Sequence, residues 1–102
     1  DQSLAVLYLM TADHTLWIKT KRSIDRNGKV DLQSVHLGDI STDGYALWKA
    51  VKELQTGERQ ISLCELSDSD VISDRAFRLI VQAVTIAHFG MAALNEPEVR
   101  HV

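Results

Sequence analysis

Apolar residues in the first half of the chain alternate in patterns that favour β-strands. Residues 4–10 are apolar on both alternating faces, which predicts a buried central strand. A second strand is expected over residues 16–21, with one mainly apolar face and one amphipathic face. These faces are formed by Leu16, Ile18 and Thr20 and by Trp17, Lys19 and Lys21.

A turn and two further extended segments complete the expected sheet. Asn27-Gly28 favours a type I′ turn, because both residue types tolerate positive φ. The turn would join the second strand to a third over residues 29–37, where the alternation slips near Gln33 and predicts a bulge. Residues 59–65 alternate weakly, which indicates a short fourth strand or an extended connector.

The second half of the chain carries two helical patterns. Residues 41–44 offer several N-cap oxygens to a helix over residues 45–55, which Gly57 is placed to end. A second helix is expected from about Asp74 to Leu94, with acidic side chains at its start, where the helix dipole favours them.

From Leu79 to Leu94 the second helix is apolar round most of its circumference, and only Gln82, Thr85 and His88 interrupt it. A domain of 102 residues can cover only part of such a helix. We therefore expect a homo-oligomer, most simply a dimer, or a permanent protein partner. The interface would be formed by Phe77, Ile80, Val84, His88 and Met91.

These elements together predict the α+β class. The expected fold is an antiparallel sheet of three to four strands, arranged as a meander, with two helices packed on one face. Residues 1–95 would form a single domain, and residues 96–102 a flexible C-terminal tail.

Composition places the chain among ordinary small globular domains. Its hydrophobic fraction is 45% and its net charge is −3, which is not the basic balance of a dedicated DNA-binding domain. The single cysteine, Cys64, favours a reducing compartment. The longest apolar run, Leu79–Leu94, is shorter than the ~20 residues that cross a bilayer. We expect a cytoplasmic protein without membrane contact.

Motifs for catalysis and for metal binding are missing from the sequence. It has no histidine pair at i and i+4, no Cys-x-x-Cys, no Gly-x-Ser-x-Gly and no glycine-rich phosphate loop. No metal and no cofactor is therefore expected. His36 and Asp39 form the best acid–base pair, although ordinary loop polarity is the favoured explanation for both residues.

Two charged groups are candidates for contact with a partner. The expected basic hairpin over residues 19–29, with one aromatic side chain before it, could contact nucleic acid. This set comprises Trp17, Lys19, Lys21, Arg22, Arg26 and Lys29. The acidic set, which N-capping and solvation also explain, comprises Glu65, Asp68, Asp70 and Asp74.

Three functions follow from these patterns. The first is a small non-enzymatic protein-interaction module, acting as a regulator, an inhibitor or an assembly subunit and self-associating through its apolar C-terminal helix. The alternative is a nucleic-acid-binding module that uses the basic 19–29 hairpin. The third is a small enzyme with an active site at a subunit interface, built on His36 and Asp39.

Overall fold

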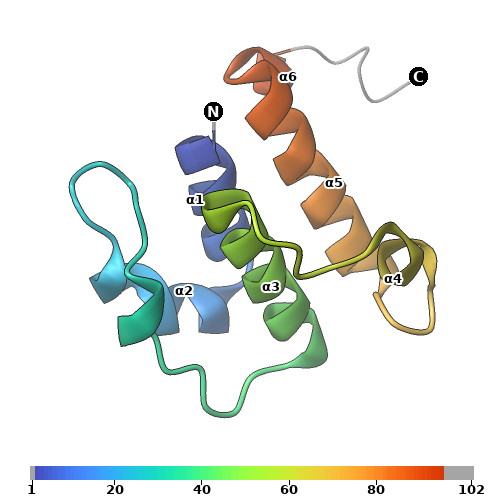
Figure 1. The fold of residues 1–102 in the computed structure, drawn as a ribbon, viewed down its shortest axis with the longest axis horizontal. Coiled ribbons are helices and arrows are strands. Elements are labelled where there is room, and N and C mark those ends of the chain that lie inside the picture. Colours follow the sequence, from blue (N-terminus) through green and yellow to red (C-terminus); the bar gives the residue numbers. More distant parts are fainter. Residues whose placement is uncertain (1, 96–102) are drawn as a thin grey trace.

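The structure, a computed structural model, describes residues 2–95, and in these residues helices alternate with connecting segments without any extended strand (Figure 1). The expected tail, residues 96–102, lies outside the described residues. The α-helices are α1 (Gln2–Thr11), α2 (His14–Thr20), α3 (Thr42–Thr56), α4 (Leu63–Ser67), α5 (Asp74–Phe89) and α6 (Ala92–Asn95). Two short 3-10 helices are η1 (Lys21–Ser23) and η2 (Leu32–Ser34).

The predicted α+β class, with its antiparallel sheet, is wrong. The expected central strand lies within α1, whose buried residues Ala5, Val6, Leu9 and Met10 follow helical spacing. A short run that is apolar at every position shows neither a period of two nor one of 3.6, so the run fits both structures. Leucine, alanine and methionine are strong helix formers, and packing against other helices decides the outcome.

The expected second strand is also a helix, α2. The Asp13 carboxylate caps it by accepting a hydrogen bond of 2.9 Å from the Leu16 N–H. Leu16 and Thr20, one turn apart, are buried, whereas Ile18 between them is exposed. Trp17 and Lys19 therefore do not share a face, because neighbours two positions apart lie on opposite sides of a helix.

The Asn27-Gly28 turn occurs where the sequence predicts it, but in another form. The Gly28 N–H donates to the Asp25 carbonyl at 3.1 Å, and the Asp25 carboxylate accepts from Asn27 and Lys29. Within residues 2–95 only glycines have positive φ, which rules out type I′. The turn is flanked by a single bridge between Ile24 and Val30 instead of two strands.

The predicted third and fourth strands are absent from the described residues. The third is replaced by η2 and extended loop, and the end of the fourth by the start of α4. The two predicted helices are confirmed as α3 and α5. The second helix ends earlier than expected, at Phe89, because Gly90 follows with a φ of 71°.

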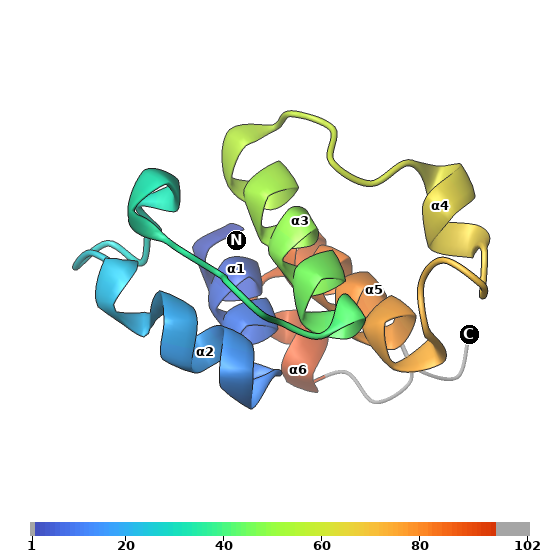
Figure 2. The ribbon, with the colours of Figure 1, turned by 90° about the horizontal axis from the view of Figure 1, so that it is seen from below.

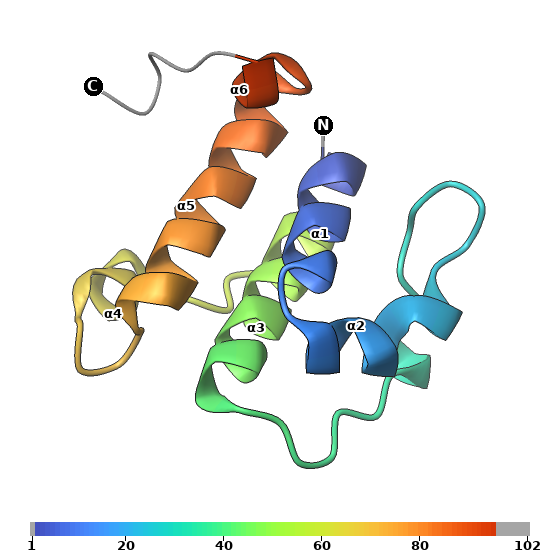
Figure 3. The same ribbon diagram turned by 180° about the vertical axis from the view of Figure 1, so that it is seen from behind.

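The core lies between α1, α3 and α5, which pack side by side (Figures 2 and 3). The smaller α2 lies beside α1 and α3, on the side away from α5 (Figure 3). Helices therefore pack on helices, and the expected arrangement of two helices on a sheet does not occur. The largest fully buried side chains are Val6, Leu9, Met10, Leu16, Thr20, Val30, Leu47, Val51 and Ile86.

One arginine joins the ends of four helices. Arg75, in the first turn of α5, donates to the Ala12 carbonyl at 3.0 Å, just after α1. Its guanidinium also pairs with Asp43 of α3 at 3.3 Å and with Asp13, the N-cap of α2, at 3.7 Å. Ser73, the N-cap of α5, donates to the same Asp43 carboxylate at 2.7 Å. We call this cluster the Arg75 junction.

Candidate protein-interaction surface

The helix α5 buries one side and exposes an apolar row on another. Its buried side chains, Ala76, Ile80, Ala83 and Ile86, face α1 and α3. A second row, at spacings of four, three and four residues, consists of Phe77, Val81, Val84 and His88. Such spacing places side chains above one another on a single side of a helix. We call this row the α5 stripe.

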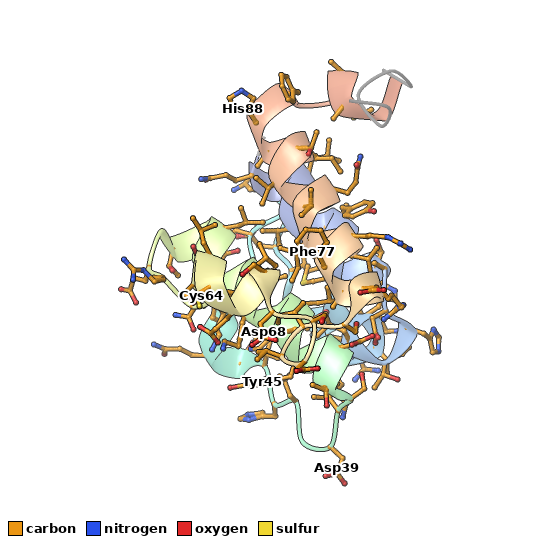
Figure 4. The ribbon with its side chains drawn as sticks, turned by 90° about the vertical axis from the view of Figure 1, so that its right-hand side faces the viewer. Asp39, Tyr45, Cys64, Asp68, Phe77 and His88 are labelled. Carbon is orange, nitrogen blue, oxygen red and sulfur yellow. The ribbon has the colours of Figure 1, made fainter. Side chains whose placement is uncertain are left out.

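The α5 stripe is accessible along its length. Phe77 and Val81 are each 40% exposed to solvent, and Val84 is 51% exposed. Phe77 lies beside α4 and His88 lies at the far end of α5 (Figure 4). The His88 imidazole meets the Phe89 ring edge-on, with their centroids 4.4 Å apart.

The five residues of the predicted interface occupy different environments. Phe77, Val84 and His88 belong to the α5 stripe, and Met91 is exposed in the turn after α5. Ile80 faces the core and is only 4% exposed. Val81, which sequence reasoning missed, completes the stripe, and its position four residues after Phe77 was the available signal.

An apolar groove lies beside the stripe, between α3, α4 and α5. Its volume is about 140 Å³. Glu53 is the one charged residue in its lining, and its carboxylate accepts hydrogen bonds from the Gln60 and Ile61 N–H groups at 2.8 and 2.9 Å. The apolar lining consists of Ala50, Leu54, Ile61, Leu63, Leu66, Ile80 and Val84. We call it the α4 groove.

A capping box holds α4 in place as one wall of the groove. The Ser62 hydroxyl accepts from the Glu65 N–H at 3.0 Å, and the Glu65 carboxylate accepts from the Ser62 N–H at 3.2 Å. The Lys49 ammonium of α3 lies 3.6 Å from the same carboxylate. The Ser62 hydrogen bond and the Lys49 charge together lower the pKa of Glu65 below its usual value.

The acidic set gathers around α4 and the start of α5. Glu65 lies on α4, Asp68 and Asp70 in the turn that follows, and Asp74 in the first turn of α5. The Asp68 carboxylate accepts from the Asp70 N–H at 2.9 Å. Asp68 and Cys64 lie on the side of the molecule that also presents Phe77 (Figure 4). Acidic and apolar groups therefore share one face.

The basic set is spread over three segments on the other side of α1 and α3. Lys19 lies on α2, Lys21 and Arg22 in η1, and Arg26 and Lys29 in the turn that follows. Trp17 packs against the core. No ion pair of the described part of the chain involves these cations.

The residues of the enzymatic hypothesis are not assembled into a site. His36 and Asp39 are exposed in the loop before α3, and no hydrogen bond or ion pair within residues 2–95 joins them. Figure 4 shows Asp39 at the tip of this loop, far from His88. Among the residues described, no group of three or more His, Cys, Asp or Glu side chains could hold a metal ion.

Comparison of the chain with protein-family models, with curated proteins and with solved structures gave no match. Within residues 2–95, none of the helices has both the length and the apolar character that a bilayer crossing requires.

Proposed function

We propose that the protein is a non-enzymatic interaction module that self-associates through the α5 stripe. In this role it would serve as a regulator, an inhibitor or an assembly subunit. The observation that carries the proposal is the exposed apolar row on α5, where Phe77, Val81 and Val84 remain open to solvent. A helix of a monomeric protein usually presents polar residues on the side that faces water.

The stripe has the symmetry that a dimer of identical chains requires. Its centre lies between Val81 and Val84, and an aromatic ring, Phe77 or His88, lies at each end. In an antiparallel pair of α5 helices, Val81 of each copy would meet Val84 of the other. Phe77 would meet His88 at both ends, as an isologous twofold interface demands. Aromatic rings in contact add to the free energy of apolar burial.

The alternatives have less support from the surface. The basic set around η1 is interrupted by the carboxylates of Asp25 and Asp31, and the packed Trp17 ring leaves less of its face for stacking on a base.

We place the protein in the cytoplasm, because an exposed single cysteine, Cys64, is compatible with a reducing compartment.

Sedimentation equilibrium of the wild type and two matched variants tests the proposal. Val81→Gln places a polar side chain at the centre of the stripe, while keeping good helix propensity. Val71→Gln makes the same change at a valine of similar exposure, 46%, that lies outside the stripe. We expect a dimeric wild type, a dimeric Val71→Gln protein and a monomeric Val81→Gln protein.

Either of two results would overturn the proposal. A wild type that stays monomeric over the whole concentration range excludes self-association. A Val81→Gln dimer as stable as the wild-type dimer moves the interface away from α5. Circular dichroism of each variant confirms that helix content is unchanged.

A further inference from the structure

The α4 groove is a second surface, distinct in shape and charge from the α5 stripe. Leu63 lies at its rim and is 84% exposed to solvent, the highest value of any large apolar residue in the described chain. The groove volume, about 140 Å³, matches one large apolar side chain. The stripe and the groove share only Val84.

A second concavity adjoins the groove on the other side of Leu66. Its volume is about 340 Å³, and it is lined by Leu66, Ser67, Ser69, Ile72, Asp74 and Phe77. Its charged lining residue is the Asp74 carboxylate, at the start of α5. An apolar site therefore lies directly beside a site that carries negative charge.

The surrounding segment has the strongest charge imbalance in the chain. Residues 53–74 contain six acidic side chains and one basic side chain, Arg59, whereas the whole chain has a net charge of only −3. One of these acids, Glu65, is paired with Lys49, and Glu53 is bonded to backbone. Of the others, Asp74 lines the second concavity, and Asp68 and Asp70 lie in the turn between α4 and α5. Negative charge beside the second concavity favours a basic partner over an acidic one.

The partner must satisfy its own backbone hydrogen bonds. Residues 2–95 offer no strand edge with which an extended peptide could pair. A helix meets this condition, and its side chains at i and i+3 or i+4 lie close enough to enter adjacent concavities.

We propose that the α4 groove binds an amphipathic, basic helix of another protein. An apolar side chain of that helix enters the groove beside Leu63 and Leu66. A lysine or arginine one turn away enters the second concavity and pairs with Asp74. This interaction goes beyond self-association, because it uses α4 and a partner of different sequence.

Fluorescence anisotropy with a labelled synthetic helix tests this proposal. The probe is an amphipathic peptide of leucine and lysine at helical spacing, and the controls are its leucine–glutamate counterpart and a scrambled leucine–lysine peptide. We expect the probe to bind the wild type at least about tenfold more tightly than either control. Leu63→Gln should weaken binding of the probe by about tenfold or more, because its side chain forms the rim of the groove.

Matched variants separate this proposal from the proposed function. Val81→Gln, which breaks the α5 stripe outside both concavities, should bind the probe at least as tightly as the wild type does, because self-association covers Phe77 and Val84, which line the concavities. Val71→Gln should bind the probe as the wild type does. Leu63→Gln should still sediment as the wild type does. Equal binding of the glutamate or scrambled peptide, or undiminished binding by Leu63→Gln, overturns the groove proposal and leaves self-association untouched.

Discussion

Two long connections leave the ends of α3, and they differ in how they are held. The first, residues 21–41, leads into α3, and its Val30 is buried to 2% exposure. The second, residues 57–73, leads to α5 and carries Leu63 with 84% exposure. The first connection therefore buries Val30 in the core, whereas the second buries Ile72 to 7% exposure but leaves Leu63 open to solvent.

A side chain near the C-terminal end of α3 anchors each connection. Gln55 donates to the Val30 carbonyl at 2.7 Å and accepts from the Val30 N–H at 2.9 Å. The Glu53 carboxylate accepts hydrogen bonds from the Gln60 and Ile61 N–H groups. The hydrogen bonds that anchor the two connections are similar. The connections therefore differ in how far two of their apolar side chains, Val30 and Leu63, are buried. Without such burial, an anchored segment forms a surface on which another molecule can bind.

The largest difference is expected when one apolar side chain is shortened in each connection, Val30 in the first and Leu63 in the second. Val30→Ala removes two buried carbon groups and leaves a cavity, so the free energy of unfolding should fall by about 2 kcal/mol. Leu63→Ala should change it by less than about 0.5 kcal/mol, because the side chain is already in water. Urea denaturation of the two variants measures both changes in the free energy of unfolding. Equal losses would show that Leu63 is also packed in the core.

Removing the Gln55 anchor tests whether hydrogen bonds or burial hold the first connection. Gln55→Ala deprives the Val30 N–H and carbonyl of their partner, which should cost about 1–2 kcal/mol of unfolding free energy. Amide hydrogen exchange of Val30 should accelerate together with this loss. If exchange at Val30 is unchanged, then burial alone holds the first connection.

The smallest effect is expected at Glu65, where it depends on pH. The folded state lowers the pKa of this carboxyl, so its ionised form stabilises the fold above the usual value of 4.5. That contribution is lost as the pH falls through the lowered pKa. Glu65→Gln keeps a side-chain acceptor for the capping box but has no charge.

Urea midpoints of wild type and Glu65→Gln check this expectation. The wild type should be slightly more stable at neutral pH, and the difference should disappear in acid. The effect is small because both partners, Lys49 and Glu65, are partly exposed. A difference that persists in acid would mean that packing of Glu65, and not its charge, holds α4.

The sequence predicts the two long helices and misses the short ones, for a physical reason. In α3 and α5, Ser41, Gly57 and Ser73 mark the ends and the apolar period is visible between them. In α1 the run from Leu4 to Met10 lacks the polar positions that would reveal a period.

The candidate surface was only partly predictable. Phe77, Val84 and His88 follow from the period of α5, but the α4 groove requires knowing that α4 packs beside α5. The sequence Ser62-Leu63-Cys64-Glu65 does carry the capping-box pattern of a helix start. That signal was readable, and it outweighs the weak alternation over residues 59–65 that suggested a strand.

The Arg75 junction has a consequence for the lifetime of the folded state. Its contacts join Arg75 to residues 32 and 63 positions away, at Asp43 and Ala12. Closing such long loops is entropically costly, so we expect these contacts to form late, after the helices have met. Interactions that are absent from the folding transition state act on the unfolding rate. We therefore expect Arg75 to slow the opening of the bundle without accelerating its assembly.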